Sequence, residues 1–86
     1  MTSALMNTYG NRALTLTKGR GCRVWDTDGK EYLDLLAGIA VCGLGHCHPA
    51  VTDAITQQAT ELLHTSNLYN LPPQQQAADL LCELSG

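Results

Sequence analysis

The sequence predicts an α+β segment, in which a small antiparallel β-meander over residues 14–36 is followed by two helices near residues 49–63 and 73–84. The main observation is a change of period: apolar residues alternate with polar ones within the meander, and recur at steps of three and four in the helices. Glycine-containing turns separate the alternating runs, and prolines stand where the helical runs begin. Residues 1–13 show no period and are expected to form an irregular arm.

Three short alternating runs define the meander. Residues 14–17 are a strand candidate, and residues 18–21 carry the two glycines of a turn. Residues 22–26 alternate again, which places Val24 on the face opposite Trp25. Asp-Gly at positions 28–29 then predicts a hairpin leading to a returning strand over residues 32–35, because glycine accepts a positive φ at little cost.

The segment between the meander and the first helix is rich in glycine and small apolar residues. Three glycines within residues 37–48 argue against a regular helix or strand and favour a backbone that approaches something closely. Pro49 predicts the start of the first helix, and Pro72-Pro73, with Asn70 as a candidate cap, the start of the second. The apolar stripe of the first helix is Val51, Ala54, Ile55, Ala59, Leu62 and Leu63. The inward face expected of the second is Ala77, Leu80, Leu81 and Leu84.

Composition excludes several classes of function. The 86 residues support one domain at most, and the five Lys and Arg residues are scattered, so a nucleic-acid-binding protein is not expected. The longest apolar run, residues 35–44, falls short of the ~20 residues that a membrane span needs. With no signal-peptide pattern at the start and four cysteines in no disulfide-scaffold spacing, free thiols and a cytoplasmic location are expected.

One cluster of residues has the side chains of a metal site. Cys42, His46, Cys47 and His48 lie within residues 42–48, and all four residue types bind zinc. A structural zinc site, however, usually draws its ligands as pairs from two separate segments. We therefore interpret the cluster as a turn leading into the helix at Pro49, and predict no metal.

The remaining polar residues give no convincing catalytic or cofactor-binding setting. Neither pair of closely spaced glycines fits a nucleotide-binding fingerprint. Lys18 and Lys30 fall in predicted turns, where an ammonium group stays hydrated, unlike a Schiff-base lysine. The meander carboxylates are interpreted as solvated or turn residues. They are Asp26, Asp28, Glu31 and Asp34.

Taken in order, several short motifs resemble the amino-terminal segment of the class III (subgroup II) aminotransferases. The resemblance covers about residues 9–86, and its individual pieces are weak, but the ordered set is specific. The motifs are Gly19-Arg20-Gly21, Val24-Trp25-Asp26, Asp28-Gly29, Tyr32-Leu33-Asp34, Gly38-Ile39-Ala40-Val41, Leu44-Gly45-His46-Cys47-His48-Pro49-Ala50-Val51 and His64-Thr65-Ser66-Asn67.

The resemblance implies a homodimeric enzyme that depends on pyridoxal 5′-phosphate and has the fold-type I transferase fold. It also implies that residues 14–86 form the amino-terminal part of the small domain, and that the large cofactor-binding domain is absent from this chain. The Schiff-base lysine, the phosphate cup and the substrate-carboxylate arginine of the family lie beyond the position matching Gly86. The chain is therefore expected to be a fragment that is inactive alone and lines the substrate side of the site.

Within the family, the motifs are most similar to members that transfer an amino group from N-acetylornithine to 2-oxoglutarate in bacterial arginine biosynthesis. Tyr9 and Ile39 match substrate-facing positions, with an ordinary surface tyrosine and plain core packing as the alternatives. Other donors stay open: ornithine, succinylornithine, 4-aminobutyrate and succinyl-diaminopimelate. A different class of function, a non-catalytic small interaction domain, also stays open.

Overall fold

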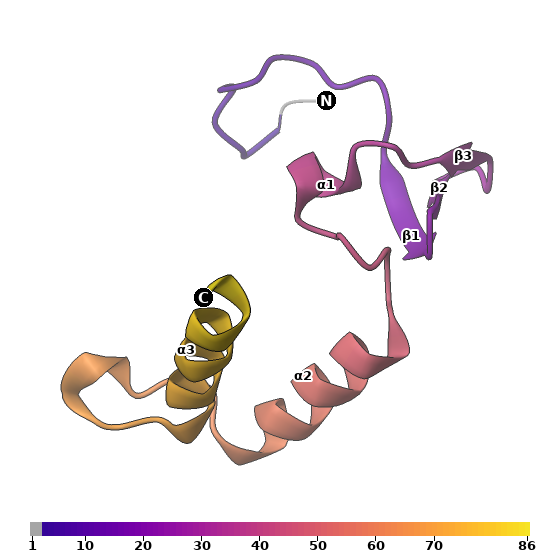
Figure 1. The fold of residues 1–86 in the computed structure, drawn as a ribbon. Helices are drawn as coiled ribbons and strands as arrows, with labels where there is room; N and C mark the ends of the chain where they lie inside the picture. The colour runs from indigo at the N-terminus through magenta and orange to yellow at the C-terminus, as the bar shows by residue number, and fades with distance from the viewer. Residues whose placement is uncertain (1–2) are drawn as a thin grey trace. The chain divides into compact units, whose positions relative to one another are not determined.

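The computed structural model describes residues 3–86, and the chain divides into two units whose boundary lies between Ile55 and Thr56. The first unit contains the three strands β1 to β3 and the short element α1, and the second contains α3 (Figure 1). Helix α2 crosses the boundary, so each unit is described by itself. From the start of the described region to residue 15, the chain forms neither helix nor strand.

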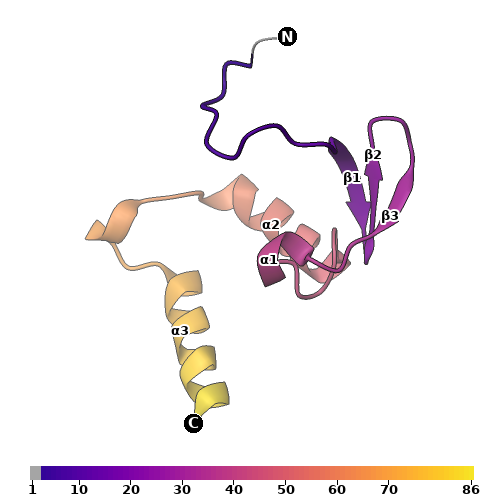
Figure 2. The same ribbon diagram turned by 90° about the horizontal axis from the view of Figure 1, so that it is seen from above.

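The first unit is built on a three-stranded antiparallel sheet in the order β1-β2-β3 (Figure 2). Its strands are β1 (Leu16–Arg20), β2 (Arg23–Asp26) and β3 (Glu31–Leu33). The predicted meander and the Asp-Gly hairpin are thus confirmed, and Gly29 has a φ of +80° at the β2–β3 turn. The β1–β2 register shifts between Leu16 and Lys18, which marks a bulge.

The position of the first turn is a correction to the sequence prediction. Lys18, Gly19 and Arg20 belong to β1, and the chain reverses at Gly21 and Cys22, because Arg20 pairs with Arg23. Gly21 has a φ of +57°, so the left-handed residue of this two-residue turn is a glycine. Glycine at position 19 has a different purpose, the accommodation of His46, and is described below.

Burial within the described residues is slight. Val24 in β2 is the one buried apolar residue there, at 7% exposure, on the sheet face that the alternation predicts. The apolar run after β3 is exposed: Leu35, Ile39 and Val41 are all at least 80% exposed. This run contains α1 (Ala37–Ala40), whose backbone is not that of a right-handed helix.

Helices α2 (Pro49–Glu61) and α3 (Pro72–Ser85) confirm the two predicted helices to within a few residues at each end. A 3₁₀ turn, η1 (Ser66–Leu68), lies between them in the chain. The predicted cap Asn70 is wrong, since Leu71 occupies the N-cap position and makes no side-chain cap bond.

The face of α3 that is expected to point inward is exposed within the described residues. No residue of α2 or α3 is buried. Leu80, Leu81 and Leu84 are 54–76% exposed, so their apolar side chains are without cover in the residues described. Within residues 3–86, no helix is both long enough and apolar enough to cross a membrane.

Candidate functional site

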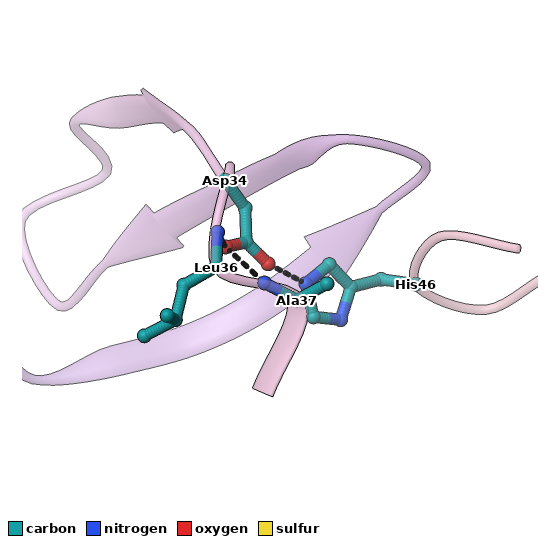
Figure 3. A network of polar contacts seen from close by, with 4 residues as sticks. All are labelled: Asp34, Leu36, Ala37 and His46. Carbon is teal, nitrogen blue, oxygen red and sulfur yellow. Dashed lines mark hydrogen bonds and ion pairs between the residues drawn. The ribbon is translucent and has the colours of Figure 1, made fainter. Parts of the chain in front are cut away.

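The best-defined polar cluster surrounds the Asp34 carboxylate, directly after β3 (Figure 3). Its Oδ1 accepts the backbone N–H groups of Leu36 at 3.0 Å and Ala37 at 2.9 Å. Its Oδ2 lies 2.5 Å from Nε2 of His46, which donates to it. The two side chains are 15% and 25% exposed, so the pair is partly shielded from water. One carboxylate therefore joins the start of the glycine-rich segment to its end.

His46 is itself fixed to the sheet. Its N–H donates to the carbonyl of Gly21 at 2.8 Å, and its own carbonyl accepts the N–H of Gly21 at 2.9 Å. Its ring lies against Gly19, where an added Cβ would stand 2.7 Å from the ring Cγ. Only glycine fits at position 19 without displacing this histidine, which explains a glycine in the middle of a strand.

The backbone between Asp34 and His46 contains a left-handed turn. All four residues of α1 have positive φ, and three of them carry a Cβ: Ala37 at 54°, Ile39 at 62° and Ala40 at 65°. Positive φ is a genuine outlier for a β-branched residue such as isoleucine. Left-handed backbone costs roughly 1–2 kcal/mol for each residue with a Cβ. Strain of this kind persists only where the surroundings hold it, and it concentrates at functional sites.

Asp26 forms a second, closely similar cluster at the β2–β3 hairpin. Its Oδ1 accepts the backbone N–H groups of Asp28 and Lys30, both at 2.9 Å, and its Oδ2 accepts the Tyr32 hydroxyl at 2.9 Å. The hydrogen bond to the Asp26 carboxylate raises the pKa of Tyr32 above its ordinary value of 10.0. Here the residue with positive φ is Gly29.

Hydrogen bonds lower the pKa of both carboxyl groups below the ordinary aspartate value of 3.8. For Asp34 the largest cause is the N–H of Ala37, followed by His46. For Asp26 the largest cause is the N–H of Lys30, followed by the Tyr32 hydroxyl. Each of these donors favours the ionised carboxylate.

Sequence reasoning missed these two carboxylates, which it interpreted as solvated or turn residues. A local signal was present: aspartate commonly accepts N–H groups two to four residues further along the chain, as both residues do here. The Asp34–His46 bond spans twelve positions and has no such signal.

The two residues predicted to face substrate lie outside this hydrogen-bonded cluster. Tyr9 lies in the irregular amino-terminal segment, is 80% exposed and carries the Arg12 guanidinium 5.6 Å from its ring centroid. Ile39 lies at the strained turn and is 81% exposed. Both side chains are thus exposed among the described residues, and the substrate-facing role of each stays a prediction.

The four residues considered as zinc ligands do not share one site, because the two histidines make different contacts. His46 binds Asp34, while Nδ1 of His48 accepts the N–H of Ala50 at the start of α2. Cys42 and Cys47 are free thiols, as are the other two cysteines. Residues 3–86 contain no group of three or more His, Cys, Asp or Glu side chains placed to hold a metal.

An open groove of about 710 Å³ lies beside β1 and the segment before α2. Lys18 and Arg20 of β1, Trp25 of β2, and His46 and His48 contribute to its lining. The lining of the groove therefore includes two cationic side chains and one aromatic ring, and His46 belongs both to this lining and to the Asp34 cluster.

A family model described as aminotransferase class-III matches residues 5–86. The chain belongs to the class-III aminotransferase family. It is 53% identical over 83 residues to acetylornithine aminotransferase from Nostoc sp., covering 96% of this chain and 19% of that relative. The family predicted from the ordered motifs is thereby confirmed.

Solved structures of the family contain the same fold segment. N-acetylornithine aminotransferase from Stenotrophomonas maltophilia superposes with a TM-score of 0.73 at 49% identity, covering 86% of this chain and 21% of that one. The ornithine aminotransferase of Toxoplasma gondii, crystallised with partial occupancy of pyridoxal phosphate at its active site, superposes at 0.84 with 34% identity, covering 94% and 19%. This chain thus spans about a fifth of the length of such relatives.

Proposed function

We propose that this chain is the amino-terminal part of a pyridoxal-phosphate-dependent enzyme that transfers an amino group from N-acetylornithine to 2-oxoglutarate, in arginine biosynthesis. The observation that carries the proposal is 53% identity to an acetylornithine aminotransferase across nearly the whole chain. The chain contributes residues 14–86 to the small domain and residues 1–13 as an arm, and the large domain lies elsewhere in the protein. The enzyme is a cytoplasmic homodimer, and its partners are amino-acid substrates rather than nucleic acid or membrane.

We expect the cofactor site to lie mainly outside the residues described here. Lys18 and Lys30 are exposed, and their ammonium groups lie 4.7 Å from the Trp25 ring centroid and 5.3 Å from that of Tyr32. A lysine that binds the cofactor aldehyde needs a setting that releases its proton, which water-exposed positions do not provide. Bound pyridoxal phosphate supplies the electron sink for amino transfer. Its lysine and phosphate-binding groups therefore belong to the large domain.

The contribution of this chain is the shape of the substrate side. Ile39 lies on a turn whose entry is fixed by the Asp34 carboxylate, which also binds His46 at the end of the segment that follows. An aliphatic side chain at this position leaves room for a substrate that a large aromatic ring would exclude. Tyr9, on the irregular arm, is proposed to approach the distal end of the same substrate.

Steady-state kinetics of the full-length enzyme test the proposed reaction. With 2-oxoglutarate as acceptor, kcat/KM is measured for N-acetylornithine, ornithine, succinylornithine, 4-aminobutyrate and succinyl-diaminopimelate, and glutamate formation is followed. The proposal expects N-acetylornithine to be the best donor. A higher kcat/KM for one of the other four would transfer the assignment to that donor.

The role of Ile39 has its own test in the full-length enzyme. Ile39→Trp is expected to lower kcat/KM for N-acetylornithine far more than it lowers the melting temperature, because the indole ring occupies space that the substrate needs. Over-packing in a core costs ~1–3 kcal/mol of stability. If the variant loses stability by that amount, seen as a lower melting temperature, and activity per folded molecule is unchanged, Ile39 is a core residue.

A further inference from the structure

We propose that Asp34 and His46 are positioning residues, whose mutual hydrogen bond holds the left-handed turn Ala37–Ala40 in the shape that presents Ile39 to the amino donor. This inference rests on the proposed function. Neither residue needs to touch the substrate, since both act through the backbone that lies between them. The pair would therefore set donor specificity from outside the substrate pocket.

The turn Ala37–Ala40 is strained and, among the residues that the structure describes, has little packing to hold it. Ala37, Ile39 and Ala40 have positive φ, and Ile39 is 81% exposed. Two backbone hydrogen bonds lie within and around the turn: the N–H of Ala40 donates to the Leu36 carbonyl, and the N–H of Cys42 donates to the Ala37 carbonyl. Within the described residues, the contacts that hold this strain in place are therefore polar ones.

Asp34 and His46 supply polar contacts of this kind (Figure 3). Asp34 fixes the entry to the turn through the N–H groups of Leu36 and Ala37, and through His46 it joins this entry to the end of the glycine-rich segment that follows the turn. His46 is anchored by its paired backbone bonds to Gly21 and by the space that Gly19 leaves for its ring. The entry of the turn, and the segment that follows the turn, are thereby tied to the sheet.

A comparison of Asp34 with Asp26 separates a positioning role from a purely stabilising one. Asp26 makes the same set of bonds, two to backbone N–H groups and one to a side chain, but closes a hairpin whose left-handed residue is Gly29. Asp26→Ala is thus a matched control for Asp34→Ala. Both variants lose three hydrogen bonds to one carboxylate, and only one of them releases the strained turn.

The experiment uses the full-length enzyme and the ratio of kcat/KM for N-acetylornithine to kcat/KM for ornithine. Asp34→Ala is expected to change this ratio by about tenfold or more and to raise KM for N-acetylornithine, because small displacements of a positioned group are costly. Asp26→Ala should lower the melting temperature to a similar degree and leave the ratio unchanged. A wild-type ratio in Asp34→Ala would overturn the proposal.

A pair of substitutions at His46 covers the case in which Asp34→Ala does not fold. Glutamine places its amide nitrogen near the position of Nε2, whereas asparagine reaches only as far as Nδ1. His46→Gln is therefore expected to keep the donor ratio within about threefold of wild type, and His46→Asn to change it as Asp34→Ala does. Equal ratios in the two variants would contradict the proposed hydrogen bond.

Failure of the proposed function is distinguishable from failure of this inference. If wild-type enzyme prefers another donor, the same ratio is measured between that donor and the next best, and the substrate assignment alone falls. If no donor reacts, amide hydrogen exchange at Ala40 and Cys42 is measured. Exchange there should accelerate in Asp34→Ala and not in Asp26→Ala, and an unchanged rate in Asp34→Ala would overturn the inference.

Discussion

The hairpin after β2 and the turn after β3 use the same carboxylate arrangement for two different backbones. In each, an aspartate at or just beyond the end of a strand accepts two backbone N–H groups and one side-chain donor, Tyr32 for Asp26 and His46 for Asp34. The two differ in reach: the first side-chain bond spans six positions and the second twelve. The first closes a local turn, and the second joins two segments.

The difference in backbone is the more informative one. The hairpin places glycine at its left-handed position, Gly29. The turn after β3 places Ala37, Ile39 and Ala40 there as well as Gly38. Reversing the chain does not require that strain, since the hairpin reverses it without any. The strained turn is thus the part of the chain whose exact shape is expected to matter for function.

The largest effect is expected where the strained segment meets the sheet. Gly45 has a φ of +83°, and a Cβ there would stand 2.9 Å from the Gly21 carbonyl oxygen. Gly45→Ala should destabilise the full-length protein by about 2–5 kcal/mol, the sum of left-handed strain and overpacking. Urea unfolding measures this loss. Gly43→Ala is the control, because nothing lies within 4 Å of a Cβ at position 43 and its φ is not left-handed. Equal losses in the two variants would contradict the contact between Gly45 and Gly21.

Two exchanges between glycine and alanine, one in each turn, are expected to change the stability of the protein in opposite directions and by an intermediate amount. Gly29→Ala should cost about 1 kcal/mol, since a Cβ there meets no atom within 4 Å and only the backbone strain is added. Ala40→Gly should stabilise by up to about 1 kcal/mol, since it removes such strain from the second turn. Melting temperatures of the two variants, measured together, check the signs. Destabilisation by Ala40→Gly would mean that the turn is not strained at that residue.

The smallest effect is expected in the dependence of stability on pH under acidic conditions. Hydrogen bonds from Lys30 and Ala37, respectively, hold the pKa of Asp26 and of Asp34 below the ordinary value of 3.8. A depressed folded pKa adds stability that is complete above the ordinary value and is lost as the pH falls through the folded one. Asp26→Asn and Asp34→Asn should each reduce the drop in melting temperature between about pH 7 and pH 3. A drop as large as that of wild type in both variants would show that these carboxylates do not contribute to acid sensitivity.

The sequence predicted the elements whose signals are local. Asp28-Gly29 predicted the hairpin, and Pro49 predicted the start of α2, because turn chemistry and proline geometry act over a few residues. The turn predicted over residues 18–21 was wrong, because Gly19 serves a tertiary contact with His46 that no period reveals. Left-handed φ at alanine and isoleucine was likewise invisible, since residue type gives no signal for it.

The substrate-facing residues were predicted from family resemblance, and their setting could be seen only in the structure. Ile39 was expected at a close-approach segment, and it lies on the strained turn within that segment. The inward face of α3 stays a prediction, because burial depends on what covers a helix, and the described residues supply no cover for Leu80, Leu81 or Leu84. Amphipathic period thus predicts that a helix exists but not its partner.

We propose that the turn after β3 serves the substrate and that the hairpin after β2 serves the fold. Amide hydrogen exchange of the full-length enzyme, with and without N-acetylnorvaline, tests it most directly. This compound is N-acetylornithine without the amino group that is transferred, so it binds without reacting. On binding, we expect the amide hydrogens of Ala40 and Cys42 to exchange more slowly and those of Gly29 and Lys30 to exchange at an unchanged rate. An unchanged rate at Ala40 and Cys42, or equal slowing in both turns, would contradict it.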